Sequence, residues 1–174
     1  MPALTDIPIY HITDLANLPG IMKGGGLHSD VRMAEHNPEV IGYDHIKKRR
    51  AEEIQVSCCG GRFVGEFVPF YYCPRSPMLY TINKGNTGKA VGCQRTIVHL
   101  VSTVGAAIES ASDWAISDGN AGAFHCLFSK EIAALEDLDW DAIRARSWQG
   151  RTHQKMAELL IADFFPWQAI TQIG

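Results

Sequence analysis

The stretch IPIYHIT, residues 7–13, predicts a β-strand whose two faces differ in chemistry. Isoleucine, tyrosine and threonine favour strands, and successive side chains of a strand point to opposite faces. His11 and Thr13 therefore share one face, while Tyr10 and Ile12 share the other. An imidazole beside a hydroxyl on one face indicates contact with water or with a polar ligand.

The rest of the chain mixes strands and helices without the strict alternation that a parallel sheet requires. A short helix stopped by glycines is expected at 15–28, a loop with one helical turn at 31–42, and a segment of either type at 158–166. Further strands are expected at 66–74, 95–102 and 114–120, a helix at 43–54, and one or two helices at 129–148. This order favours an α+β fold with a mostly antiparallel sheet.

Composition is that of one globular domain. The 174 residues are 46% hydrophobic and 20% charged, which are ordinary fractions. No apolar run reaches the length of about 18 residues that a membrane span needs, and the N-terminus resembles no secretory signal. Five cysteines without a CxxC spacing predict a reduced, cytoplasmic protein without disulfides. With a net charge of −3, binding of nucleic acid would need a local basic patch.

Common metal and phosphate motifs are missing from the sequence. The seven histidines and five cysteines have no spacing typical of a zinc site, so we expect no metal. The segment KGGGLH, 23–28, fits neither dinucleotide-binding nor P-loop glycine patterns and is better explained as a helix stop.

One basic run predicts a buried cation. Ile46, Arg50 and Ile54 are spaced i, i+4 and i+8, so they share one stripe of the predicted helix. The run KKRR, 47–50, fits a solvated basic face, as most charge runs do. Arg50, however, lies on the apolar stripe, where a guanidinium needs an anionic or polar partner because an unpaired buried charge is costly.

Two other segments allow both a structural and a functional interpretation. VPFYYCPRSPMLY, 68–80, is either a core strand entering a rigid turn or a surface on which a planar ring stacks, with Arg75 and Ser76 just beyond the strand. Glu158 is either a surface residue or, if its segment is a strand, a carboxylate at the rim of the core. Such carboxylates often take part in catalysis.

Taken together, several stretches resemble the DarT family of DNA ADP-ribosyltransferase toxins. These stretches are IPIYHIT…NLPGIM, YDHIKKRR, VPFYYCPRSPMLY, LDWDAI and AELLIADFFPW. The resemblance implies the ADP-ribosyltransferase fold of diphtheria-toxin-like and PARP-like enzymes, over a single domain, 1–174. It also implies transfer of ADP-ribose from NAD⁺ to a thymidine base of single-stranded DNA, with release of nicotinamide and without a metal. Because many members continue beyond the position of Gly174, we expect this chain to lack their C-terminal extension.

The resemblance further implies roles for individual residues. The expected catalytic residues are Glu158 and Arg50. The segment 117–125 corresponds to the family's substrate-recognition loop. The expected NAD⁺-binding residues are His11, Thr13, Asn17, Leu18 and Tyr71. The expected DNA-binding residues are Lys47, Arg49, Arg75, Ser76, Met78 and His125, and further candidates for phosphate contacts are Lys48, Lys84, Lys89 and Arg95.

The expected partners are single-stranded DNA and a cognate DarG macrodomain antitoxin, and we expect a monomer that binds no membrane. Three alternatives remain open at this stage. The enzyme could belong to the branch that modifies guanine, or it could act on RNA, protein or a small molecule. The domain could also bind nucleic acid without catalysis.

Overall fold

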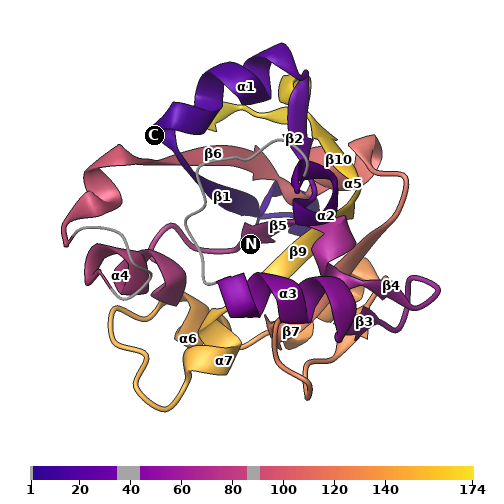
Figure 1. The fold of residues 1–174 in the computed structure, drawn as a ribbon. Helices are drawn as coiled ribbons and strands as arrows, with labels where there is room; N and C mark the ends of the chain where they lie inside the picture. The colour runs from indigo at the N-terminus through magenta and orange to yellow at the C-terminus, as the bar shows by residue number, and fades with distance from the viewer. Residues whose placement is uncertain (1, 35–43, 86–90) are drawn as a thin grey trace.

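A central antiparallel sheet organises the molecule (Figure 1). The computed structural model describes residues 2–34, 44–85 and 91–174. Among these, seven strands form one sheet in the order β11-β6-β1-β5-β9-β7-β8. Their bounds are β1 Pro8–Asp14, β5 Phe67–Tyr71, β6 Ile97–Thr103, β7 Trp114–Asn120, β8 Phe128–Ser129, β9 Ala157–Ala162 and β11 Gln172–Ile173. The α+β class with a mostly antiparallel sheet is confirmed.

Two short antiparallel strand pairs accompany the sheet: β2 Gly26–His28 with β10 Phe164–Pro166, and β3 Gln55–Val56 with β4 Arg62–Phe63. The helices are α1 Leu18–Lys23, α2 Asp30–Met33, α3 Asp44–Glu52, α4 Pro77–Asn83, α5 Val104–Ser110, α6 Trp140–Arg144 and α7 Thr152–Lys155. Short 3₁₀ turns lie at Leu4–Asp6, Leu15–Asn17, Val64–Glu66, Cys93–Thr96, Ile132–Asp137 and Trp167–Ala169. In Figure 1, α3 crosses in front of β9 and α1 lies at the far end of the sheet.

The segment 158–166, which the sequence left undecided, is two strands. Asp163 separates β9 from β10 with a left-handed φ of 63°, which is unusual for a residue other than glycine. Arg62 holds the Asp163 carboxylate at 2.5 Å. The one or two helices expected at 129–148 are two short elements, the 3₁₀ turn Ile132–Asp137 and α6. Most of the loop expected at 31–42 lies outside the described residues.

Strand β9 is buried on both of its faces. Leu159 and Ile161 join the main hydrophobic cluster together with Phe70, while Leu160 joins a second cluster on the other face. Alternation along the strand places Glu158 on the same face as Leu160. The carboxylate of Glu158 is therefore surrounded by the body of the protein rather than by solvent.

Strands β1 and β5 pair at a single position, Tyr10 with Tyr71. Beyond it, β5 presents Pro69, whose carbonyl faces β1 and accepts a hydrogen bond from His11. In a strand, the backbone nitrogen and carbonyl of one residue point toward the same neighbouring strand. The nitrogen of Pro69 therefore also faces β1, but a proline nitrogen has no hydrogen to donate to that strand. The two central strands therefore separate beyond Tyr10 and Tyr71. We call this separation the β1–β5 wedge. No helix among the described residues is long and apolar enough to span a bilayer.

Candidate active site

A bidentate ion pair joins Arg50 of α3 to Glu158 of β9. The Nη1 of Arg50 lies 3.1 Å from Oε1 of Glu158, and its Nη2 lies 2.9 Å from Oε2. The side chain of Glu158 has no exposed surface, and that of Arg50 is 12% exposed. Burial alone would lower the pKa of Arg50, but the charge and hydrogen bonds of Glu158 raise it above its usual value. Arg50 therefore has the anionic partner that its position on the apolar stripe required.

The end of β7 fixes Glu158 from the other side. The backbone N–H of Glu158 donates to Oγ of Ser117 at 2.8 Å, and this hydroxyl donates to the carbonyl of Gly119 at 2.7 Å. The N–H of Ala121 donates to Oε1 of the Glu158 carboxylate at 3.3 Å. These contacts fix the position and orientation of the carboxylate before any substrate arrives.

Tyr71 completes the group around the carboxylate. It is paired directly with Glu158 across β5 and β9, so both side chains lie on one face of the sheet. Burial raises the pKa of Tyr71, the charge of Glu158 raises it further, and the charge of Arg50 partly opposes this. The phenol thus stays protonated at neutral pH and can donate a hydrogen bond.

His11 lies in the β1–β5 wedge. Its Nδ1 is 2.8 Å from the carbonyl oxygen of Pro69, and because a carbonyl only accepts, Nδ1 carries the hydrogen. The ring centroid is 5.6 Å from that of Phe70. Burial lowers the pKa of His11, and the hydrogen bond to Pro69 opposes this in part. The imidazole is therefore neutral, with Nε2 as its acceptor atom.

His11 and Arg50 are connected through an ion pair that bridges α2 and α3. The Nζ of Lys47 lies 2.7 Å from Oδ1 of Asp30. The charge of Asp30 acts on both His11 and Arg50, so the wedge and the Arg50–Glu158 pair belong to one electrostatic neighbourhood. The structure thus brings Arg50, Glu158 and Tyr71 together, whereas strand alternation places the His11 side chain on the opposite face of the sheet from Tyr71, against Pro69 and Phe70.

The other residues expected to bind NAD⁺ follow His11 along β1. Thr13 is buried, and its hydroxyl accepts a hydrogen bond from Nδ2 of Asn17 at 3.2 Å. Leu18 begins α1 and packs against the main core. His11 and Thr13 share a face of β1, as predicted, and Asn17 is tied to that face.

Residues expected to bind DNA lie on two separate parts of the surface. On one part, Arg49 of α3 donates to the carbonyl of Gly122 at 3.3 Å and lies 5.6 Å from the ring of Phe124. His125 is exposed and stacks on His153, with 4.3 Å between ring centroids. Lys47, expected to bind DNA, is instead paired with Asp30.

The second part of this surface follows β5. Arg75 is exposed, whereas Ser76 is buried and accepts a hydrogen bond from the N–H of Leu79, so it caps α4. Met78 is half-buried and packs against a small apolar cluster. This placement favours a structural role for Ser76.

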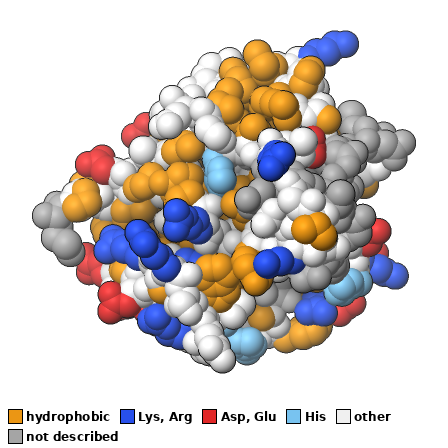
Figure 2. Space-filling model, turned by 90° about the vertical axis from the view of Figure 1, so that its left-hand side faces the viewer, with side chains coloured by type: hydrophobic (Ala, Val, Ile, Leu, Met, Phe, Trp, Pro, Cys, Tyr) orange, Lys and Arg blue, Asp and Glu red, His pale blue; other side chains and the backbone are white. Residues whose placement is uncertain are grey.

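Of the two interpretations of 68–80, the core strand is favoured, because Phe70 and Tyr72 are buried. Tyr71, which lies between them in the sequence, keeps partial exposure. Lys48, Lys84 and Arg95 are exposed, and Lys89 lies outside the described residues. On the face of the molecule that Figure 2 shows, basic and apolar side chains lie in the middle and acidic side chains lie mostly toward the margins.

Three residues near the site were not predicted from the sequence. Asp30 follows a helix-capping serine and looked like an ordinary first-turn carboxylate. Ser117 was assigned only to a loosely matched loop, and its role depends on pairing with Glu158, 41 residues away. His153 lies in a short helix, and its contact with the same loop has no local signal in the sequence.

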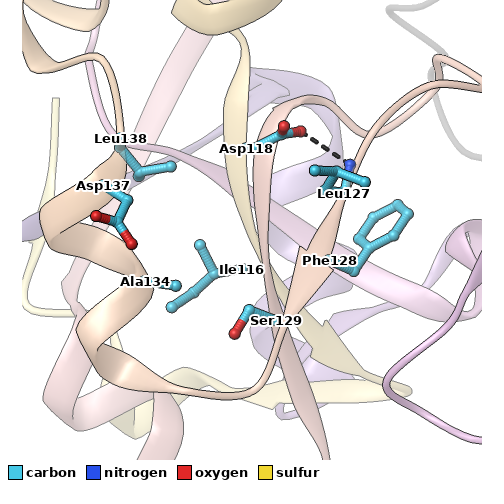
Figure 3. Close-up of a pocket in the computed structure, with 8 residues that line it drawn as sticks. All are labelled: Ile116, Asp118, Leu127, Phe128, Ser129, Ala134, Asp137 and Leu138. Atoms are coloured by element: carbon cyan, nitrogen blue, oxygen red, sulfur yellow. Dashed lines mark hydrogen bonds between the residues drawn. The ribbon is translucent and has the colours of Figure 1, made fainter.

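A pocket lined by none of the expected catalytic or NAD⁺-binding residues is shown in Figure 3. Ile116, Leu127, Ala134 and Leu138 line it together with acidic Asp118 and other residues. Asp118 there accepts a hydrogen bond from the N–H of Leu127 at 2.9 Å (Figure 3). Among the described residues, no cluster of histidine, cysteine, aspartate or glutamate side chains is arranged to hold a metal ion.

The chain is also similar to known proteins. Residues 10–174 match the family described as "ssDNA thymidine ADP-ribosyltransferase, DarT". A DNA ADP-ribosyl transferase of Thermus aquaticus is 39% identical over 168 residues, which cover 95% of this chain and 73% of the relative.

Two solved structures are also similar. The structure of Thermus sp. 2.9 DarT in complex with ADP-ribosylated ssDNA superposes with a TM-score of 0.86 at 36% identity, over 96% of this chain and 80% of that one. The same protein in complex with NAD⁺ gives a TM-score of 0.82 at 34% identity, over 99% and 82% of the two chains.

Proposed function

Because this chain belongs to the DarT family of single-stranded DNA thymidine ADP-ribosyltransferases, we propose that it transfers ADP-ribose from NAD⁺ to a thymidine base of single-stranded DNA. Two observations on relatives support this activity: Thermus sp. 2.9 DarT has been solved with NAD⁺ and with ADP-ribosylated ssDNA. The observation that carries the proposal here is the buried, bidentate Arg50–Glu158 pair. The reaction breaks the bond between ribose C1 and nicotinamide, and forms a bond from that carbon to a thymine nitrogen.

We assign Glu158 to stabilisation of the ribose of NAD⁺ during bond cleavage. Cleavage of a glycosidic bond passes through an oxocarbenium-like transition state, and a fixed carboxylate stabilises the positive charge that develops. The N–H of Ala121 and the guanidinium of Arg50 already fix this carboxylate. Because Glu158 has no exposed surface, substrate reaches it only when the Arg50 side chain moves aside.

Once it has moved aside, Arg50 can act on the thymine base. The thymine nitrogen carries a proton and becomes a good nucleophile only as this proton leaves. A guanidinium released from Glu158 can hold the carbonyl oxygens of the base and stabilise the resulting anion, while Glu158 accepts the proton. Arg50 stays protonated throughout, because a guanidinium does not lose its proton in a protein.

The β1–β5 wedge is assigned to NAD⁺. Nε2 of His11 is an acceptor, the phenol of Tyr71 is a donor, and Thr13 with Asn17 adds polar atoms on the face of His11. Together with Leu18, these groups would orient the dinucleotide and contribute proximity rather than bond-making.

Single-stranded DNA is assigned to the surface around Arg49, His125 and Arg75. A base paired inside a duplex cannot present its nitrogen to a buried carboxylate, so an unpaired strand is the natural substrate. Lys and Arg side chains on this surface supply phosphate contacts. Ser76 and Met78 were expected here too, and their burial leaves Arg75 as the more accessible member of that segment.

The biological setting is part of the same proposal. The family resemblance supports action as the toxin of a toxin–antitoxin pair, with a DarG macrodomain that removes the modification. A monomer acting on DNA in the cytoplasm is consistent with this role.

The activity can be tested with labelled NAD⁺ and single-stranded oligonucleotides that contain either thymidine or guanosine as the modifiable base. We expect label on the thymidine oligonucleotide and none on its guanosine counterpart. Label on guanosine would assign the chain to the other branch, and label on protein or RNA alone would contradict a DNA substrate. DNA binding without any label would indicate a non-catalytic module.

A further inference from the structure

The contact between Ala121 and Glu158 depends on an irregularity in the sheet. The pairing of β7 with β9 shifts register between Ile116 and Asn120, which is the mark of a β-bulge. Bulges next to active sites redirect backbone and side-chain groups. Here the shift places the N–H of Ala121 on Oε1 of Glu158, at 3.3 Å.

His153, from α7, supports this bulge. Its Nδ1 accepts a hydrogen bond from the backbone N–H of Asn120 at 3.2 Å. Its ring packs so tightly on Gly119 that a Cβ at that position would overlap the imidazole. Gly119 is thus a glycine because the ring approaches its backbone, and Asn120 directly precedes the residue that donates to Glu158.

We propose that His153 is a positioning residue for the transfer reaction: its neutral imidazole holds Gly119 and Asn120 so that the Ala121 N–H stays on the Glu158 carboxylate. This inference rests on the proposed function, since it assigns Glu158 to the reaction. His153 itself is 23% exposed, and it contacts Asp118, Asn120 and His125.

The proposal makes the positioning sensitive to acid. Nδ1 accepts the hydrogen bond only while it carries no proton. After protonation Nδ1 is itself a donor, so two donors, Nδ1–H and the Asn120 N–H, would face each other. Asp118 of β7 faces Nε2 of His153 at 3.6 Å, and His125 stacks on the ring. Burial and His125 lower the pKa of His153, whereas Asp118 opposes them. Lys155, on the same helix, is directed to backbone carbonyls elsewhere.

Two substitutions separate positioning from mere packing. His153→Asn offers an oxygen near the place of Nδ1 that does not titrate, whereas His153→Ala removes the acceptor. We expect His153→Ala to lower kcat by about tenfold, as loss of one positioning hydrogen bond would, with the KM for NAD⁺ unchanged. His153→Asn should retain kcat near neutrality, and its acid limb should lie at lower pH than in the wild type. His28, whose ring packs on that of Phe164, provides the matched control. His28→Asn should change neither kcat nor the acid limb of the pH profile.

A double-mutant cycle tests the contact with Gly119. Gly119→Ala should reduce kcat in the wild-type background, because the new Cβ displaces the imidazole. In the His153→Ala background the same change should have little further effect. Equal effects in both backgrounds would contradict the proposed contact.

An NMR titration makes the test independent of catalysis. The amide signals of Asn120 and Ala121 should move as His153 titrates in the wild type and should not do so in His153→Asn. Absence of that response, or wild-type kcat and pH profile in a folded His153→Ala, would overturn the proposal. If the wild-type protein transfers no ADP-ribose, the proposed function fails, and the amide titration still decides whether His153 holds the bulge.

Discussion

Arg50 and Glu158 form an ion pair that stability alone does not explain. Removing two charges from water costs several kcal/mol per ion, and a well-packed apolar pair of similar size is often as stable. Yet the pair is bidentate, nearly sealed from solvent and supported by a backbone N–H. Its retention in the interior fits a catalytic role better than a structural one.

Removal of Arg50 should affect both activity and stability. In Arg50→Ala, the Glu158 carboxylate stays buried without its cation, so we expect loss of transfer and a decrease of about 3–5 kcal/mol in the free energy of unfolding. Urea denaturation and the labelled-NAD⁺ assay measure the two effects.

Arg144→Ala is the matched control for that change. Arg144 is exposed and stacks on Trp140, so its removal should cost only about 0.5–1 kcal/mol and leave transfer intact. Full activity of Arg50→Ala would remove Arg50 from the mechanism.

The sequence predicted one half of this pair well. Helical spacing placed Arg50 on the inward stripe and required an anionic partner. It could not identify that partner, because Glu158 is 108 positions away and only the sheet brings it near. The resemblance to a known family supplied Glu158. His153 had neither a local pattern nor a motif, since its role exists only where α7 meets the bulge.

Among the elements, β5 determines where the β1–β5 wedge forms. Pro69 interrupts pairing with β1 beyond Tyr10 and Tyr71, and His11 takes the free carbonyl. The sequence predicted both strands but not their separation, because the partner of a strand and the extent of pairing depend on residues far away in the chain. The same reason left 158–166 undecided, where Asp163 makes a sharp break between two strands.

Restoring a backbone N–H at position 69 should close the β1–β5 wedge. Pro69→Val supplies an N–H toward β1, so we expect further pairing of the two strands and a KM for NAD⁺ raised by about tenfold, the equivalent of roughly one lost hydrogen-bonded contact. Initial rates at varied NAD⁺ measure this.

Pro8→Val, at the exposed start of β1, is the control and should leave the KM unchanged. An unchanged KM in a well-folded Pro69→Val would show that NAD⁺ does not use the wedge.

For the molecule as a whole, neutral histidines link stability to pH. The pKa of His11 is lowered from an ordinary value of 6.5 in the folded protein, so the unfolded chain binds its proton more readily. Stability is therefore complete above pH 6.5 and falls as pH decreases toward the folded pKa. His153, with a lowered pKa as well, adds to this trend.

Urea unfolding at a series of pH values measures the linkage. We expect the free energy of unfolding to decrease on acidification below about pH 6.5, and His11→Gln to show a smaller decrease than the wild type. An identical pH dependence in the two proteins would mean that the His11 imidazole is not neutral in the folded state.

The central claim is that one buried carboxylate, held by Arg50, catalyses transfer to thymidine. Mass spectrometry of a thymidine-containing single strand after incubation with NAD⁺ tests it most directly, with wild type, Glu158→Gln and the control Glu66→Gln, whose carboxylate pairs with Arg62 outside the site. The account predicts an ADP-ribose adduct on thymidine with wild type and Glu66→Gln, and none with Glu158→Gln. An adduct of equal yield with Glu158→Gln would contradict it.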